Sequence, residues 1–328
     1  MKAVAGILFS LILLVTACGS DEAPRWVDDD VTFTADGLTI YGTYRHERGG
    51  PTRPAALLIS ESGNTDRNGD NAVAGPVGNM RQLAELLSDR GVASLRYDKI
   101  GTGKTGLGPY AQRPKDVVSS VYTSGAKAAV SYLAEQPASD KSHISVYAVG
   151  EGAVHAMALA TDTNVGAPKI HSLALFQPLP GRYLDIITNR VRASASPEAL
   201  KTWLAAVEQI RTKGTVPPNL PEGLGALVNP GNINAVIEAD KIDPVMLAAK
   251  VPASTPVLLT CSDADKQATC ESIQPLVDAL QHTELTVVDL KGVSHVLRED
   301  PTDNVANYAK QDPLSPQLVS ALDAFVGK

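Results

Sequence analysis

The sequence predicts an α/β fold in which a mostly parallel sheet is covered by helices on both faces. Short apolar runs rich in β-branched residues alternate along the chain with segments in which leucines recur at helical spacing. Such alternation is typical of parallel strands joined by helical crossovers. The chain has 328 residues, 44% of them hydrophobic, which is enough apolar material for one large core.

The first element predicted is a β-hairpin. Residues 31–34 and 38–44 alternate apolar and polar side chains, and the Asp36-Gly37 pair between them favours a tight turn. We expect this hairpin to form an antiparallel edge of the sheet.

The remaining core elements alternate between strand and helix. The predicted strands cover residues 55–60, 92–97, 144–149, 170–176, 256–260 and 285–290. The predicted helices cover residues 80–90, 117–134, 154–160, 271–280 and 316–325. Gly91 directly after the first of these helices is a typical C-terminal stop.

The interval from Gln177 to Lys250 interrupts this alternation. Its apolar spacing predicts helices at 183–192, 197–213 and 244–250, with a Pro/Gly-rich stretch at 214–231. An insertion at this point is expected to lie over the carboxyl ends of the strands, where open α/β sheets bind ligands. We therefore predict a helical cap at about 178–250 inside a single domain of residues 30–328.

The N-terminus predicts export and a lipid anchor. Lys2 precedes an apolar run at 4–15, and Val15-Thr16-Ala17-Cys18 resembles a bacterial lipobox. We expect residues 1–17 to be a signal peptide, Cys18 to be acylated, and residues 18–29 to tether the domain to the membrane of the cell envelope. The alternative is an ordinary secreted protein in which this cysteine occurs by chance.

The charge and the cysteine content limit which partners, metals and cofactors the chain is expected to bind. A net charge of −7 and only 5% aromatic residues argue against a nucleic-acid partner, which requires a basic surface and stacking side chains. Cys261 and Cys270 are close in sequence and are expected to form a disulfide in an oxidising envelope. A metal site at these cysteines is the weaker interpretation because no second ligand pair stands nearby, so we predict neither a metal nor a cofactor.

A sharp turn at residues 148–153 carries the strongest functional signal. An apolar strand runs through small residues into a helix, which is the backbone of a nucleophile elbow. Ala148 and Gly152 provide the small residues that flank the apex of such an elbow. The apex itself is Gly150, which has no side chain that could attack a substrate.

An acid and a base are predicted at two later positions. In hydrolases of this type the chain order is nucleophile, acid, base. Asp265 follows the strand at 256–260, and His295 follows the strand at 285–290. Asp263 and Asp289 compete with Asp265 for the role of the acid.

Four segments resemble bacterial α/β-hydrolase esterases, a group related to acylaminoacyl-peptidase-like enzymes. They lie around the loop Ser62-Gly63-Asn64-Thr65-Asp66-Arg67, the stretch 94–104, the strand and acid loop at 256–268, and the loop Gly292 to His295. The resemblance covers nearly all of residues 30–328. It implies an α/β-hydrolase fold, an oxyanion hole formed at Ser62, Gly63 and Glu151, a small acyl or ester ligand, Asp265 as the acid and His295 as the base.

The chain departs from this family where the nucleophile should stand. The resemblance places a serine at the position of Gly150, so the family mechanism lacks its attacking atom. One hypothesis is a lipoprotein that binds an ester-type or acyl ligand with little or no turnover. The other is a working hydrolase in which Glu151, Ser62 or a water activated by His295 replaces the serine. The sequence predicts neither the ligand nor the oligomeric state.

Overall fold

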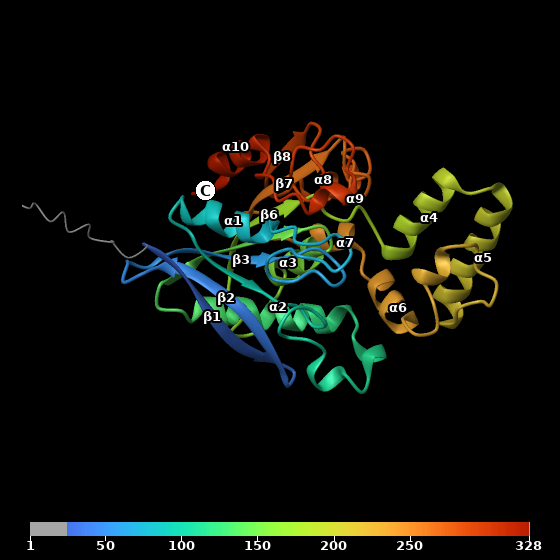
Figure 1. The fold of residues 1–328 in the computed structure, drawn as a ribbon, viewed down its shortest axis with the longest axis horizontal. Coiled ribbons are helices and arrows are strands. Elements are labelled where there is room, and N and C mark those ends of the chain that lie inside the picture. The colour runs from blue at the N-terminus through green and yellow to red at the C-terminus, as the bar shows by residue number, and fades with distance from the viewer. Residues whose placement is uncertain (1–24, 328) are drawn as a thin grey trace, which may run out of the picture.

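An eight-stranded sheet forms the centre of the protein in the computed structural model, which describes residues 25–327 (Figure 1). The strands are β1 (Trp26–Ala35), β2 (Leu38–Glu47), β3 (Arg53–Ile59), β4 (Ala93–Tyr97), β5 (Ser139–Val149), β6 (Ile170–Phe176), β7 (Pro256–Ser262) and β8 (Glu284–Leu290). The predicted signal peptide, Cys18 and most of the predicted tether lie outside the described residues.

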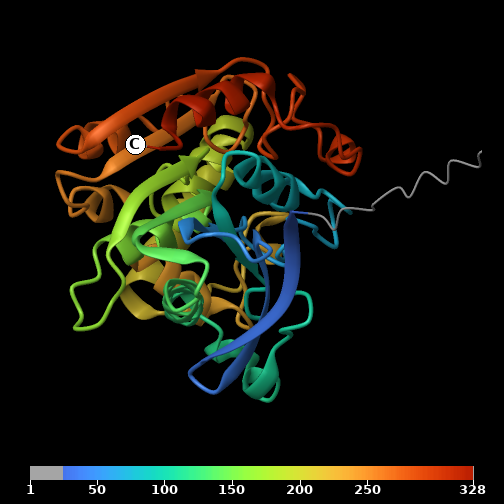
Figure 2. The ribbon, with the colours of Figure 1, turned by 90° about the vertical axis from the view of Figure 1, so that its left-hand side faces the viewer.

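The strands follow the order β1-β2-β4-β3-β5-β6-β7-β8. Strands β1 and β2 form the predicted antiparallel hairpin, and β2 joins β4 in antiparallel orientation, whereas the pairs from β4 to β8 are parallel. The hairpin turns at Asp36 and Gly37, whose φ angles of 49° and 78° match the turn type that suits twisted hairpins. Figure 2 shows this hairpin at one end of the sheet and β8 with helix α10 at the other.

Helices cover both faces of the sheet because consecutive residues of each strand point to opposite sides. On β3, Ala55, Leu57 and Ile59 pack in the same cluster as α2 (Ser119–Ala134), α3 (Gly152–Ala160) and α8 (Gln274–Leu280). Ala56 and Leu58 pack with α1 (Asn79–Ser88) and α10 (Pro316–Phe325) on the other face. This two-sided burial explains why the central strands are almost entirely apolar.

The interval at 178–250 is helical, and most of it stands apart from the sheet (Figure 1). It contains α4 (Tyr183–Ser194), α5 (Pro197–Lys213), α6 (Ile233–Lys241) and α7 (Pro244–Ala248). Helices α4 to α6 share a hydrophobic cluster of their own around the fully buried Trp203. Helix α7 instead contributes Ala248 to the cluster beneath the sheet. Helix α6 was not predicted, because it is short and follows a turn-rich stretch.

Asp240 holds the cap helices together. Its carboxylate accepts hydrogen bonds from the Leu184 amide at 2.9 Å, from Arg182 at 3.0 Å and from Arg211 at 2.8 Å. One buried carboxylate therefore joins the start of α4 to α5 and α6 through charge-assisted bonds. Among residues 25–327, no helix combines the length and the hydropathy that crossing a bilayer requires.

Candidate active site

The carboxyl end of β5 forms a tight elbow. The strand ends at Val149, Gly150 follows with φ 54°, and α3 begins at Gly152. A Cβ atom on Gly152 would lie 2.8 Å from the Ile59 carbonyl oxygen, so a side chain at this position would collide with β3. The small residue predicted at position 152 is therefore required by the close approach of the start of α3 to the end of β3.

The structure brings Asp265 and His295 together beside this elbow. His295 Nδ1 lies 2.7 Å from Asp265 Oδ2, and both side chains are buried. The other carboxylate oxygen of Asp265 accepts the Gln267 and Ala268 amides, which fixes its orientation. The competing carboxylates are engaged elsewhere, because Asp263 accepts the Gly292 amide at 2.7 Å and Asp289 pairs with Lys291 at 2.6 Å.

A residue that the sequence analysis missed completes the site. Glu61 lies two residues after the end of β3, and its Oε2 lies 2.6 Å from His295 Nε2. Its Oε1 accepts the Ser62 amide at 2.5 Å and the Glu151 amide at 3.4 Å. These are two of the amides expected to form an oxyanion hole. The Glu61 side chain is 21% exposed, against 3% for His295 and 0% for Asp265.

Glu61 fills the space that a side chain at position 150 would need. A Cβ atom built on Gly150 would lie 1.5 Å from Glu61 Oε2 and 2.4 Å from the carboxyl carbon. Such separations are far below any real contact, so a glutamate in this conformation requires glycine at the elbow. The observed arrangement is a Glu61–His295–Asp265 triad in which one carboxylate oxygen faces the imidazole and the other faces the two amides.

Glu61 and His295 each stabilise the charged form of the other. Burial alone would raise the pKa of Glu61, but the imidazolium of His295 and the hydrogen bonds from His295 and the Ser62 amide lower it to about 2. Burial would lower the pKa of His295, but the charge of Glu61 and the hydrogen bond to Asp265 raise it to about 10. At neutral pH the imidazole is therefore protonated, and it has no lone pair with which to act as a general base.

Comparisons with solved structures identify the fold. No family model and no curated protein sequence matches the chain. An esterase of Pyrococcus furiosus aligns over 92% of this chain and 94% of its own at 19% identity, with a TM-score of 0.54. Est1E of Butyrivibrio proteoclasticus, solved with ferulic acid, aligns over 85% and 96% at 18% identity and a TM-score of 0.55. A dienelactone hydrolase-like phosphotriesterase from metagenomic libraries aligns over 92% and 96% at 15% identity and a TM-score of 0.52.

The chain has the α/β-hydrolase fold. The structural matches establish this architecture. Because the sequence identities are below 20%, they do not establish the chemistry, which depends on the site itself. Within the α/β-hydrolase fold, the elbow after β5, Asp265 after β7 and His295 after β8 follow the chain order expected for this architecture.

Ser62 and Glu151, the two residues proposed as substitute nucleophiles, contact the triad through their backbone amides. Ser62 is exposed, and it presents its amide to the triad. Glu151 contributes its amide, and burial raises the pKa of its carboxyl group. The side chain of Glu151 lines a cavity of about 20 Å³ together with His155 and Tyr183. Gly63 lies on the exposed tip of the loop after β3 with φ 65°.

Lys99 and His155 complete the polar surroundings of the elbow. The Lys99 ammonium donates to the carbonyl oxygens of Ser60 at 3.2 Å and of Glu61, which secures the end of β3. Burial lowers the pKa of Lys99, although the charges of Glu151 and Glu61 oppose this shift. Burial also lowers the pKa of His155 to about 3, so its imidazole is neutral.

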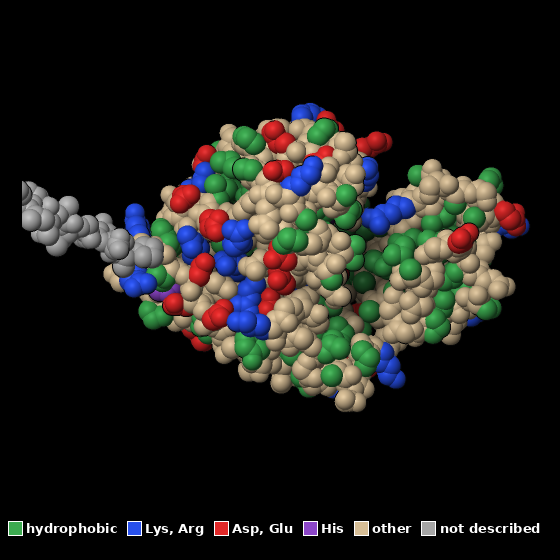
Figure 3. Space-filling model, in the orientation of Figure 1, with side chains coloured by type: hydrophobic (Ala, Val, Ile, Leu, Met, Phe, Trp, Pro, Cys, Tyr) green, Lys and Arg blue, Asp and Glu red, His purple; other side chains and the backbone are tan. Residues whose placement is uncertain are grey.

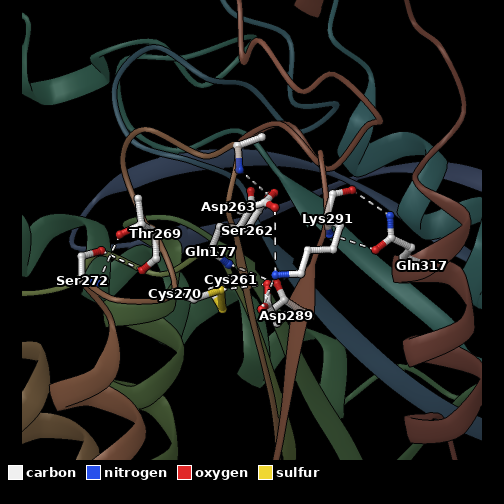
Figure 4. Close-up of a disulfide and its surroundings, with 12 residues drawn as sticks. Gln177, Cys261, Ser262, Asp263, Thr269, Cys270, Ser272, Asp289, Lys291 and Gln317 are labelled. Carbon is white, nitrogen blue, oxygen red and sulfur yellow. Dashed lines mark hydrogen bonds and ion pairs between the residues drawn. A yellow bond between two sulfur atoms is a disulfide. The ribbon is translucent and has the colours of Figure 1, made fainter.

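The structure joins Cys261 and Cys270 in a disulfide at the base of the loop that carries Asp265 (Figure 4). Cys261 is a buried residue of β7, and Cys270 lies nine positions further on, with a Cα–Cα distance of 4.9 Å. Among the described residues, the one group with the spacing of metal ligands is these two cysteines with Asp289. The sulfur atoms are bonded to each other and leave no thiolate for a metal.

Proposed function

We propose that this protein is a cell-envelope lipoprotein that uses an α/β-hydrolase fold to bind a small acyl or ester-type ligand without turnover by a serine triad. The observation that carries the proposal is the position of Glu61. Its carboxylate lies between His295 and the two amides, where a substrate carbonyl and an attacking hydroxyl would otherwise meet.

Three features support a site without acyl transfer. Gly150 offers no nucleophilic atom. The amides of Ser62 and Glu151 are occupied by Glu61 Oε1 and are not available to a developing oxyanion. His295 is held as an imidazolium between two carboxylates, so it does not activate water at neutral pH. The acid and base positions of the fold are thus retained as an ion-paired cluster.

A second candidate is supported by the same carboxylate. Glu61 Oε2 lies next to the base, and carboxylates form covalent intermediates in some enzymes. A hydrolase acting through Glu61, Glu151, Ser62 or water would depend on His295. The low pKa of Glu61 makes this oxygen a weak nucleophile, and its partner oxygen blocks the oxyanion site. We therefore rank this candidate second.

Labelling and turnover assays test the proposal. The wild-type protein is expected to resist a fluorophosphonate probe and to hydrolyse p-nitrophenyl acetate no faster than the His295→Ala variant. Hydrolysis by the wild type that is lost in His295→Ala would contradict the proposal and favour the second candidate. Glu61→Ala and Glu151→Ala, assayed in parallel, would then assign the nucleophile.

The lipid anchor is tested separately at Cys18. In a bacterial host the full-length protein is expected to incorporate labelled fatty acid and to enter the detergent phase of Triton X-114. The Cys18→Ser variant should do neither, whereas Cys270→Ser should still be acylated. Acylation that persists in Cys18→Ser would contradict the proposed anchor.

A further inference from the structure

A groove of about 760 Å³ lies between the cap and the core, beside the Asp265–His295 pair. Its lining includes Arg190 of α4, Lys266, Gln267, Asn304, Val305 and Tyr308. Figure 3 shows the surface hollowed between the cap and the core, with Lys or Arg side chains at the edge of the hollow. The groove is therefore an open space that reaches the neighbourhood of the triad.

The groove is the larger of two spaces that border the site. The cavity on the Glu151 side measures about 20 Å³, which is roughly the space of one water molecule. Lys266, by contrast, directly follows Asp265, and Asp303 in the groove wall accepts the His295 amide at 2.9 Å. Of these two spaces, the groove is the one large enough for a small organic ligand.

The groove carries two cations without an anionic partner. Arg190 contacts the Gln267 side-chain oxygen at 3.4 Å, and Lys266 Nζ donates to the Thr302 carbonyl at 2.8 Å. Within residues 25–327, neither side chain forms an ion pair with a carboxylate. Both are exposed, which leaves them free to reorient toward a ligand.

The carboxylate in the groove wall offsets one of these two cations and leaves the other without a counter-charge. Asp303 is 6% exposed and accepts hydrogen bonds from the His295 amide, the Lys266 amide and the Tyr308 hydroxyl. These donors are uncharged, so Asp303 keeps its negative charge, and the groove with Arg190 and Lys266 has a formal balance of one positive charge. In a chain of net charge −7, a groove with this local balance is selective for anions.

We propose that the groove binds the carboxylate end of a small ligand, with Arg190 and Lys266 as its anchors. A guanidinium presents paired N–H donors that match a carboxylate, and a nearby ammonium adds a point charge. Val305 is 48% exposed at the same wall and provides an apolar contact for a short hydrocarbon chain. The proposal rests on the proposed function and assigns the ligand class of that site as a monocarboxylate with a short apolar chain.

Calorimetric titration with hexanoate and with hexanol tests this assignment. Hexanoate is expected to bind the wild-type protein, more weakly as salt is raised, whereas hexanol, which lacks the charge, should bind at least tenfold more weakly. Arg190→Gln and Lys266→Gln should each weaken hexanoate binding about tenfold or more. Arg192→Gln is the matched control, since this exposed arginine of the same helix contacts Asn189.

Equal binding of hexanoate and hexanol would overturn the assignment, as would unchanged affinity in both groove variants or an equal loss in Arg192→Gln. Melting temperatures within a few degrees of the wild type show that the variants are folded. Fluorophosphonate labelling of the same preparations separates the two proposals. If the wild-type protein neither binds hexanoate nor labels, the groove proposal alone is refuted, whereas labelling of a wild type that binds hexanoate refutes the non-catalytic function alone.

Discussion

Replacing Gly150 with serine tests whether Glu61 is the group that keeps the elbow without a nucleophile. The new Cβ would lie 1.5 Å from Glu61 Oε2, about half of the closest separation that real Cβ atoms show. A φ of 54° adds a cost of roughly 1–2 kcal/mol for any residue with a side chain. Gly150→Ser alone should therefore displace Glu61 from His295, lower the melting temperature, and leave the displaced carboxylate crowding the site.

The double variant Glu61→Ala, Gly150→Ser removes the overlap and frees the Ser62 and Glu151 amides. It also removes the charge that raises the pKa of His295, so the imidazole becomes available as a base. Loss of a catalytic serine costs on the order of 10⁶ in turnover in a subtilisin-type protease. We expect the restored serine to recover part of this, about 10³-fold or more in ester hydrolysis over Glu61→Ala.

The assay combines fluorophosphonate labelling with p-nitrophenyl acetate hydrolysis at neutral pH. Glu61→Ala is the control without a nucleophile, and adding His295→Ala to the double variant is the control without a base. The double variant should label, and both controls should not. If Gly150→Ser alone labels as fast as the double variant, Glu61 does not obstruct the site and the argument from its position is wrong.

Three further predictions concern the ion-paired cluster and the disulfide. His295→Ala should lower the free energy of unfolding by about 3–5 kcal/mol, because it leaves two carboxylates without their counter-charge, whereas the exposed His143→Ala should cost less than about 1 kcal/mol by chemical denaturation. Because the pKa of Glu61 is lowered, its contribution to the stability of the folded protein is complete above about pH 4.5 and is lost as the pH falls toward 2. Because the pKa of His295 is raised, its contribution is complete below about pH 6.5 and is lost as the pH rises toward 10. The difference in unfolding free energy between wild type and Glu61→Gln should thus be largest between these limits, and a pH-independent difference would contradict the ion pair. Reduction of the Cys261–Cys270 bond should destabilise the protein by about 2–3 kcal/mol, measured as a melting shift with dithiothreitol that a Cys261→Ser, Cys270→Ser variant does not show.

The architecture could be predicted from the sequence because it depends on local periodicity. The central strands are apolar on both faces, and the core helices repeat their leucines at helical spacing, so both signals are contained in short windows. Helix α6 could not be predicted in this way, because its nine residues follow a turn-rich stretch and only Val236 and Asp240 among them are buried. The fold prediction was confirmed by the sheet order and by the structural relatives.

Glu61 could not be found in the same way because its partner lies 234 positions away along the chain. The family resemblance assigns the loop after β3 a role in the oxyanion hole through Ser62 and Gly63, and it gives no role to the side chain of Glu61. One signal was present in the sequence. A glycine at the apex of an elbow leaves a volume that a neighbouring side chain can fill, and a glutamate stands two residues after the end of the adjacent strand.

The complementarity between Gly150 and Glu61 also bears on how the protein can change over time. Regaining serine first places a Cβ atom 1.5 Å from Glu61 Oε2, and losing the glutamate first leaves the His295 imidazole without one of its two carboxylate partners. Each single step therefore passes through a less stable protein before any benefit arises. The two positions form an epistatic ratchet, in which a lineage that has acquired this pair is hindered from returning to the serine form by one substitution at a time.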